Sequence, residues 1–243
     1  WDTHEYPFFV KQKKHCIDEG TQFNDYKDTY NDYIQYKEQN SAMRKAKKII
    51  KDFNGDTHKT VLFLSYKAEN WNTMDNIYKK YCQEKDIKVI VQCVPYYYKN
   101  IDGTFEKYID GGMYPEYVTI TPIEDYNYVN ENPDVIVFQY PYDNYNSAGT
   151  TDPVFYSYNL ASHTQKLIYI PYFRTDEIDE NDMRAYTNMD AYVTMPGVVY
   201  ADKVIVQSEE IRKLYIKKLT DFFGEESEDE WEDKIEAEDI GGI

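Results

Sequence analysis

The chain has 243 residues, a hydrophobic fraction of 42% and a formal net charge of −17. This is enough apolar material for the core of one large domain or two small ones. The acidic balance argues against broad binding to DNA or RNA, because lysine and arginine supply non-specific affinity for a phosphate backbone. It leaves room for one small basic pocket that holds a phosphorylated ligand.

The cysteines and histidines predict neither a metal site nor a disulfide framework. Cys16, Cys82 and Cys93 are odd in number and widely spaced, and the four histidines form no pair with ligand spacing. No apolar run approaches the ~20 residues that cross a bilayer. We therefore expect a cytoplasmic protein with reduced thiols and no cofactor. The start at Trp1, without an initiator Met, predicts numbering that begins inside a longer chain.

Residues 1–55 form a polar segment that is predicted to be helical. No proline interrupts Lys11–Glu19 or Phe23–Phe53, and Gly20 is a plausible helix stop. Tyrosines and one isoleucine recur near helical spacing between residues 26 and 36. This spacing favours a helical hairpin that packs on the main domain or forms a homo-oligomer contact over residues 1–53.

Lysines near the end of this segment allow a second interpretation. A local basic face on a helix can contact the inner face of a membrane. The net charge disfavours an anionic bilayer, and lysines on a solvated helix more often serve solubility. The lysines concerned are Lys45, Lys47, Lys48 and Lys51.

After the break at Asn54-Gly55-Asp56, predicted strands and helices alternate. We expect strands at 60–66, 87–94, 118–120, 134–139, 166–170 and 204–207, and helices at 72–84, 123–130, 153–162, 179–188 and after Ser208. The stretch 95–117 is predicted to be a long loop. Short connections between alternating elements are typical of an α/β fold, here a Rossmann-like doubly wound parallel sheet over residues 56–224.

Residues 225–243 are predicted to follow this lobe as an acidic tail or linker. Between Glu225 and Asp239 there are ten acidic residues and one lysine. Trp231 and Ile235 are four residues apart, so a short helix could dock through them.

Three predicted strands end in proline followed by tyrosine. These ends are Pro95-Tyr-Tyr97, Pro141-Tyr142 and Pro171-Tyr172. Because an open α/β sheet holds its ligands at the carboxyl ends of its strands, the pattern predicts a cleft lined with phenol groups. The alternative is that many of the 27 tyrosines simply fill the core or reflect an AT-rich genome.

Two loops offer further candidate binding residues. Lys67 and Trp71 follow the first strand, where they could hold a phosphate and stack on a ring, or belong to an ordinary loop whose tryptophan covers the core. The loop 144–153 offers amides, hydroxyls and a carboxylate that could bind a polyol, a sugar or a phosphate. Its candidates are Asn144, Tyr145, Thr150, Thr151 and Asp152.

Other signals in this part of the chain are weaker. Thr151-Asp-Pro153 could equally be a helix N-cap with proline at the first helical position. His163 is predicted to be a surface or capping residue rather than a general base. No glycine-rich dinucleotide motif, Walker loop or Gly-x-Ser-x-Gly elbow occurs.

Several short blocks, in order, resemble one group of bacterial proteins. They are Lys59-Thr-Val-Leu-Phe-Leu-Ser-Tyr-Lys-Ala-Glu-Asn-Trp71, Pro95-Tyr-Tyr97, Tyr114-Pro-Glu-Tyr-Val118, Pro141-Tyr-Asp-Asn-Tyr-Asn146, Asp152-Pro-Val-Phe-Tyr-Ser157, Tyr169-Ile-Pro-Tyr-Phe173 and Ala201-Asp-Lys-Val-Ile-Val-Gln-Ser-Glu209. The group is the CDP-glycerol:glycerophosphate glycerophosphotransferase-like family, which is related to teichoic acid polymerases. The resemblance covers roughly residues 59–235.

The resemblance implies a B-type glycosyltransferase-like fold of two lobes, of which this chain matches the amino-terminal, acceptor-side lobe. The other lobe would bind a CDP-glycerol donor, and the enzyme would transfer glycerol phosphate to a polyol phosphate or glycan of the cell envelope. Lys67, Trp71, Tyr97 and Tyr172 would then line the substrate cleft, together with the candidates of loop 144–153.

The chain departs from the family pattern at the catalytic base. Where the polymerases carry a histidine after the strand at 166–170, this chain has Pro171-Tyr-Phe173, and where relatives of this group often have His-Pro it has Asp152-Pro153. Asp152 could act as a carboxylate base instead. The alternatives are a non-catalytic module that binds a glycan or polyol phosphate, and an oligomeric scaffold.

Overall fold

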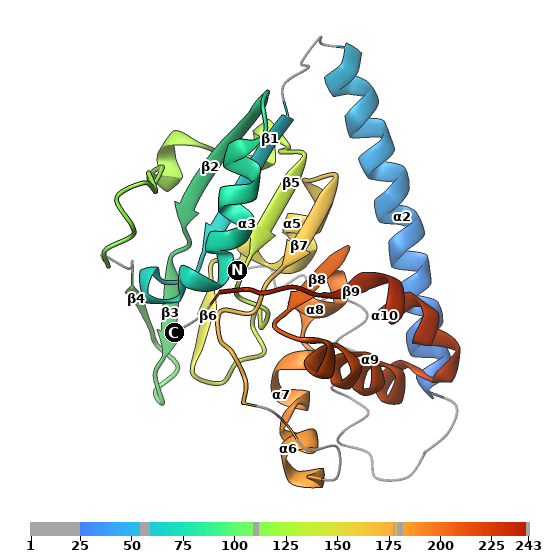
Figure 1. Cartoon of the computed structure of the whole chain (residues 1–243). Coiled ribbons are helices and arrows are strands. Elements are labelled where there is room, and N and C mark those ends of the chain that lie inside the picture. Colours follow the sequence, from blue (N-terminus) through green and yellow to red (C-terminus); the bar gives the residue numbers. More distant parts are fainter. Residues whose placement is uncertain (1–24, 54–58, 109–111, 177, 179–181, 242–243) are drawn as a thin grey trace.

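The computed structural model describes residues 25–53, 59–108, 112–176, 178 and 182–241 (Figure 1). They form an α/β fold around a six-stranded, all-parallel sheet in the order β2-β1-β5-β7-β8-β9. This confirms the predicted Rossmann-like fold class. The strands are β1 (Lys59–Ser65), β2 (Ile87–Cys93), β5 (Val135–Phe138), β7 (Lys166–Tyr169), β8 (Lys203–Val206) and β9 (Ile235–Ala237).

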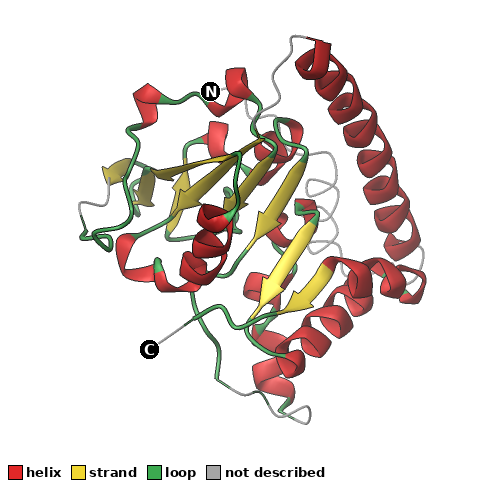
Figure 2. Cartoon of the chain, turned by 45° about the horizontal axis from the view of Figure 1, so that its top comes forward, coloured by secondary structure: helices red, strands yellow, loops and turns green. Residues whose placement is uncertain are grey.

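Helices cover both faces of this sheet (Figure 2). One face packs against α3 through Phe63 and Val137, and the other packs against α5, α8 and α9 through Leu62 and Ile136. Alternate strand residues are thus buried on opposite faces, which explains the continuous apolar runs. The helices are α2 (Asp25–Phe53), α3 (Asn72–Gln83), α4 (Tyr128–Glu131), α5 (Ser157–Ser162), α6 (Met183–Asn188), α7 (Asp190–Val193), α8 (Pro196–Tyr200), α9 (Glu209–Phe223) and α10 (Glu228–Lys234).

The predicted elements occur with three differences of detail. The helix expected at 153–162 is divided into a 3-10 turn, Pro153–Phe155, and α5. The helix expected at 123–130 is divided into a 3-10 turn, Ile123–Asp125, and α4, and the strand expected at 118–120 is reduced to one bridge between Val91 and Ile120. The helix predicted after Ser208 is α9, and Ser208 caps it by accepting a hydrogen bond from the backbone N–H of Ile211 at 3.3 Å. No described helix has both the length and the apolarity of a bilayer-crossing segment.

The predicted loop 95–117 contains a hairpin that the sequence did not reveal. Strands β3 (Tyr96–Lys99) and β4 (Phe105–Tyr108) pair antiparallel, and β6 (Gly149–Thr151) adds to β3 as a third strand. The turn between β3 and β4 has Gly103 in the left-handed region at φ 82°. Four-residue strands rich in tyrosine carry too little periodicity to be recognised.

The acidic segment folds onto the lobe that it was predicted to follow. Its α10 packs with Trp231 fully buried, and its β9 pairs with β8 as the last strand of the sheet. Arg212 of α9 donates hydrogen bonds to the backbone carbonyls of Ile235, at 2.6 Å, and Glu232, at 2.9 Å. The acidic side chains therefore belong to an ordered edge of the sheet over residues 225–241.

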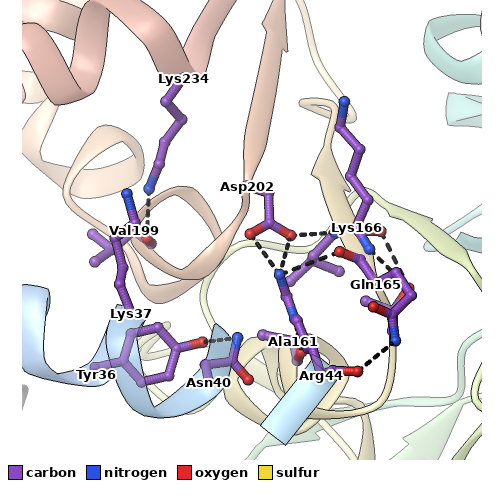
Figure 3. Close-up of polar contacts among 12 residues, drawn as sticks. Tyr36, Lys37, Asn40, Arg44, Ala161, Gln165, Lys166, Val199, Asp202 and Lys234 are labelled. Atoms are coloured by element: carbon purple, nitrogen blue, oxygen red, sulfur yellow. Dashed lines mark hydrogen bonds and ion pairs between the residues drawn. The ribbon is translucent and has the colours of Figure 1, made fainter. Parts of the chain in front are cut away.

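Helix α2 lies along one side of the molecule, and its side chains contact residues that directly precede β5, β7 and β8 (Figures 1 and 3). Arg44 forms an ion pair with Asp202, before β8, at 2.7 Å, and Lys51 forms one with Asp134, before β5, at 2.8 Å. Each of these carboxylates also accepts a hydrogen bond from a backbone N–H at a strand start: Leu167 for Asp202 and Thr60 for Asp134. Asp202 and Asp134 thus each link a cation of α2 to the start of a strand.

The first half of α2 is held by a buried polar and aromatic cluster. Tyr33 is 2% exposed, and its ring centroid lies 5.3 Å from that of Trp231 and 5.8 Å from that of Phe223. Its hydroxyl donates a hydrogen bond to Glu230 and accepts one from the buried Lys234. Lys234 also donates to the carbonyl of Val199, as Figure 3 shows. The prediction that the helical segment packs on the main domain is therefore confirmed for α2, and Lys11–Glu19 lies outside the described residues.

We expect Arg44→Met to lower the free energy of unfolding by about 1–3 kcal/mol. The variant removes the ion pair with Asp202 and the hydrogen bonds that Arg44 donates to the carbonyls of Ala161 and Gln165. Urea unfolding followed by circular dichroism measures the change. Lys48→Met, on the exposed side of the same helix, is the control and should change stability by less than about 0.5 kcal/mol. Equal losses in both variants would contradict the anchoring role of Arg44.

Candidate functional site

Tyrosines from four neighbouring strand ends meet at the carboxyl edge of the sheet. The ring centroid of Tyr66, which follows β1, lies 4.9 Å from that of Tyr96, 5.0 Å from that of Tyr140 and 5.1 Å from that of Tyr172. Tyr142 extends the group, with its hydroxyl 3.4 Å from that of Tyr172. We call these five residues the tyrosine cluster. Of the tyrosines predicted to line a cleft, Tyr142 and Tyr172 belong to this cluster, whereas Tyr97 lies on β3 opposite Thr150 and is not a member of it. The rings pack against one another between the strand ends.

Burial controls the charge state of the cluster. It raises the pKa values of Tyr66, Tyr140 and Tyr142 well above the ordinary tyrosine range, and neighbouring phenols raise them further. These hydroxyls therefore stay protonated at neutral pH and can both donate and accept hydrogen bonds. Tyr66, Tyr142 and Tyr172 are partly exposed, and neutral phenols at this edge suit a ligand that is itself rich in hydroxyls.

Lys67 brings a positive charge to this edge. Its Nζ lies 5.4 Å from the ring centroid of Tyr66 and 5.3 Å from that of Tyr96. Its ion pair with Glu69 is long, at 3.6 Å, and the Glu69 side chain is 72% exposed. A cation held over two rings, with a loosely held counter-ion, can accept an anionic group from a ligand.

Trp71 occupies a different environment from Lys67. Its side chain is buried in the core between the sheet and α3, with its ring edge-on to those of Tyr78 and Tyr114. Its Nε1 donates a hydrogen bond to Asp75 at 3.1 Å. The structure thus supports the alternative in which this tryptophan covers the core, and a ligand has no access to the indole faces in this conformation.

The loop after β5 contains a buried carboxylate that the sequence interpretation missed. Asp143 is 1% exposed and adopts the left-handed backbone conformation at φ 49°. It accepts hydrogen bonds from the backbone N–H of Ser157 at 2.9 Å and from its hydroxyl at 2.8 Å. Burial raises the pKa of Asp143 to about 7, while the two bonds from Ser157 oppose that rise. Asp and Asn after a strand predict a turn, but nothing in their pattern reveals burial.

The hydroxyl candidates of this loop lie on β6. Thr150 stands opposite Tyr97 in the β3–β6 pair, and its Oγ1 donates a hydrogen bond to the carbonyl of Asp143 at 2.9 Å. Thr151 stands opposite Tyr96, and its buried Oγ1 has no hydrogen-bond partner among the described residues. Both threonines are therefore close to the tyrosine cluster, although neither hydroxyl is exposed to solvent.

The remaining candidates have distinct positions around the cluster. Asn144 is exposed, and its carbonyl accepts a hydrogen bond from Lys99 at 2.7 Å. Tyr145 is partly buried and packs against the larger core. Asp152 follows Thr151, and its carboxylate accepts a hydrogen bond from the N–H of Val154 at 3.1 Å. Asp152 thus caps the 3-10 turn that begins at Pro153, as the N-cap interpretation predicts.

His163 lies away from this edge. It is the C-cap residue of α5, three residues before β7, and its Nδ1 is 2.8 Å from the carbonyl of Asn159. Burial lowers its pKa. The predicted capping role is confirmed, and His163 is the only histidine among the described residues. Within that part of the chain no group of acidic, cysteine and histidine side chains could hold a metal ion.

A small hollow, partly open to solvent, lies at the ends of β7 and β8, and its Phe173 contacts Tyr172 of the tyrosine cluster. It is bounded by the start of α9 and by Ile240, so the folded acidic segment helps to form it. The sequence interpretation assigned none of its residues to a binding site. They include Pro171, Phe173, Thr175, Gln207, Ile211 and Tyr215.

Asp143 gives stability a testable pH dependence. The unfolded carboxyl loses its proton near pH 3.8, whereas the folded one keeps it up to about pH 7. Between these values the unfolded state binds fewer protons, so stability falls as pH rises, by at most about 1.4 kcal/mol per pH unit from this group. Asp143→Asn keeps an acceptor for Ser157 and should flatten the profile between pH 4 and 7.

Urea unfolding at several pH values measures this slope. Asp176→Asn, which changes an exposed carboxylate, is the matched control and should retain the slope of the unaltered protein. An Asp143→Asn profile parallel to that of the unaltered protein would show that Asp143 does not contribute.

Comparisons with protein-family models, with curated proteins and with solved structures gave no match to this chain.

Proposed function

We propose that this chain is the acceptor-side lobe of a glycerophosphotransferase-like enzyme and that it binds a polyol phosphate at the carboxyl edge of its sheet. The observation that carries the proposal is the position of Lys67, with its Nζ 5.3–5.4 Å from the rings of Tyr66 and Tyr96. Four of the sequence blocks that resemble the family contain tyrosines of the cluster at this edge, namely those at 59–71, 95–97, 141–146 and 169–173. The open α/β architecture supports the location, because ligands of such folds bind at the carboxyl ends of the strands.

The chemistry of the edge fits a phosphorylated polyol. An ammonium group can pair with a phosphate, and Glu69 would give up its long contact to Lys67 on binding. Protonated phenols can donate to hydroxyl or phosphate oxygens, and their rings offer apolar surface to the carbon skeleton. The acidic remainder of the protein disfavours large polyanions, so the preference is for a small anion in a local basic site.

The transfer step itself requires an alcohol to attack a phosphoryl group. The acceptor hydroxyl would give its proton to the carboxylate of Asp152 while its oxygen forms a bond to the phosphorus that carries the glycerol. The bond from that phosphorus to the bridging oxygen breaks, and CMP leaves with the electron pair. Phosphoryl transfer depends mainly on positioning and charge stabilisation, so a carboxylate is a sufficient base.

A second candidate function is a non-catalytic module that binds a polyol phosphate or glycan. Two observations favour it. The carboxylate of Asp152 is engaged as a helix cap, and the one described histidine lies away from the carboxyl edge. Both candidates share the binding site at Lys67 and differ in whether Asp152 takes part in chemistry.

Binding is tested by titration with glycerol 3-phosphate in a calorimeter. Lys67→Gln should weaken binding roughly tenfold to a hundredfold, because a charge-assisted hydrogen bond to phosphate is lost. Lys88→Gln is the matched control, because Lys88 also lies over a tyrosine ring, that of Tyr126 at 5.9 Å, but belongs to β2 rather than the carboxyl edge. The proposed site at Lys67 would be contradicted if the unaltered protein did not bind glycerol 3-phosphate. It would also be contradicted if Lys67→Gln and Lys88→Gln weakened binding equally.

Turnover separates the two candidate functions. With a donor-binding lobe joined to the chain and CDP-glycerol supplied, release of CMP should depend on the acceptor. Asp152→Ala should then reduce kcat at least about a hundredfold, as expected for a general base, with the fold retained by circular dichroism. Turnover unchanged by Asp152→Ala would rule out the carboxylate base, and binding without any turnover would favour the non-catalytic module.

A further inference from the structure

The outward-facing side of α2 carries an apolar stripe in its second half. Ile49 is 67% exposed, Ile50 is 61% exposed and Met43 is 37% exposed. The exposed Ala42 and Ala46 lie on the same side of the helix. In Figures 1 and 2 this helix forms one side of the molecule, with the sheet on its other side. Apolar surface concentrated on one helix face is typical of an interaction site.

The anchoring contacts determine which side of α2 faces outward. Arg44, Lys47 and Lys51 bind Asp202, the carbonyl of Ser162 and Asp134, so they point toward the sheet. Ala42, Ala46 and Ile49, on the opposite side, are spaced by four and three residues, which is the spacing of a coiled-coil seam. Met43 and Ile50 widen this seam along one flank. The helix therefore cannot turn its stripe inward without breaking its ion pairs.

Opposite charges flank the other border of the stripe. Lys45 and Asp52 are both exposed, and they are seven residues apart, which is two helical turns or about 10 Å along the axis. Relative to the seam they occupy equivalent positions, where charged residues set the orientation of a partner helix. A helix with this arrangement is complementary in charge to a second copy of itself that runs in the opposite direction.

We propose that two copies of this protein associate through α2, with the two helices antiparallel across a two-fold axis. In this arrangement Lys45 faces Asp52 of the partner subunit, and Asp52 faces the partner's Lys45, while Ile49 packs on the partner's Ala46. A parallel pair would instead place Lys45 beside Ile50 of the partner subunit and form no ion pair. The interaction is independent of the carboxyl edge and of the function proposed for it.

The alternative occupant with complementary charge is an anionic membrane. Such a surface would attract Lys45 and Lys48 alike, whereas Asp52 would weaken binding to it. The whole chain also carries a formal charge of −17, which opposes contact with an anionic bilayer over its full surface. Reciprocal pairing of Lys45 and Asp52 uses both signs of charge on the helix, so a second copy fits better.

Sedimentation equilibrium of the full chain tests the proposal between about 1 µM and about 1 mM, a range that covers weak association. We expect a monomer–dimer equilibrium. Lys45→Glu alone and Asp52→Lys alone should each weaken dimerisation about five- to thirtyfold, because each creates two like-charge contacts across the axis. The double variant, Lys45→Glu with Asp52→Lys, should restore the affinity of the unaltered protein to within about twofold.

Lys48→Glu is the matched control, since it changes the net charge by the same amount from an exposed position on the helix that does not face the partner. It should leave dimerisation almost unchanged, while Ile49→Glu should abolish it. A monomer at every concentration, equal effects of Lys48→Glu and Lys45→Glu, or a double variant as weak as the single ones would each overturn the proposal. All the substituted side chains are exposed, so circular dichroism should show the same fold in every variant.

Discussion

The parallel direction of all six strands is the constraint from which the rest of the structure follows. It gathers every strand start at one edge and every strand end at the other. At the starting edge, N–H groups meet aspartates, and these in turn hold the cations of α2. At the ending edge, prolines stop the strands and tyrosines fill the space that remains. One edge thus serves stability, while the other is the natural place for a ligand.

The alternating pattern of apolar runs and polar segments was sufficient to predict the sheet. Runs such as Val61–Leu64 and Val135–Phe138 are short, rich in β-branched and aromatic residues and bounded by turn signals, so they are recognisable as buried parallel strands. Tyr66, Tyr96 and Tyr172 lie at the same edge of the sheet because each follows the carboxyl end of a parallel strand. Positions that depend on strand direction could therefore be predicted without any knowledge of side-chain packing.

Features that depend on tertiary contacts could not be predicted in this way. Residues 225–241 carry a strongly acidic composition, which is typical of a solvated tail, yet the apolar positions Trp231 and Ile235 are enough to dock α10 and β9. Asp143 has the local signal of an ordinary turn, and only the approach of Ser157, fourteen residues later, makes it a buried acid. Trp71 illustrates the reverse case, because a loop residue that suits ring stacking is taken up by the core.

Folding of this chain is coupled to proton binding, because it buries the carboxyl group of Asp143 and the amine of Lys234. Burial raises the pKa of Asp143 to about 7 and lowers that of Lys234 to about 7, so the two groups respond to folding in opposite directions. Near neutral pH the folding chain takes up protons at the carboxyl and releases protons at the amine. The two exchanges cancel near neutrality. In acid the chain takes up protons on folding through Asp143, and in alkali it releases them through Lys234, so these two groups together place a local minimum of stability close to neutral pH.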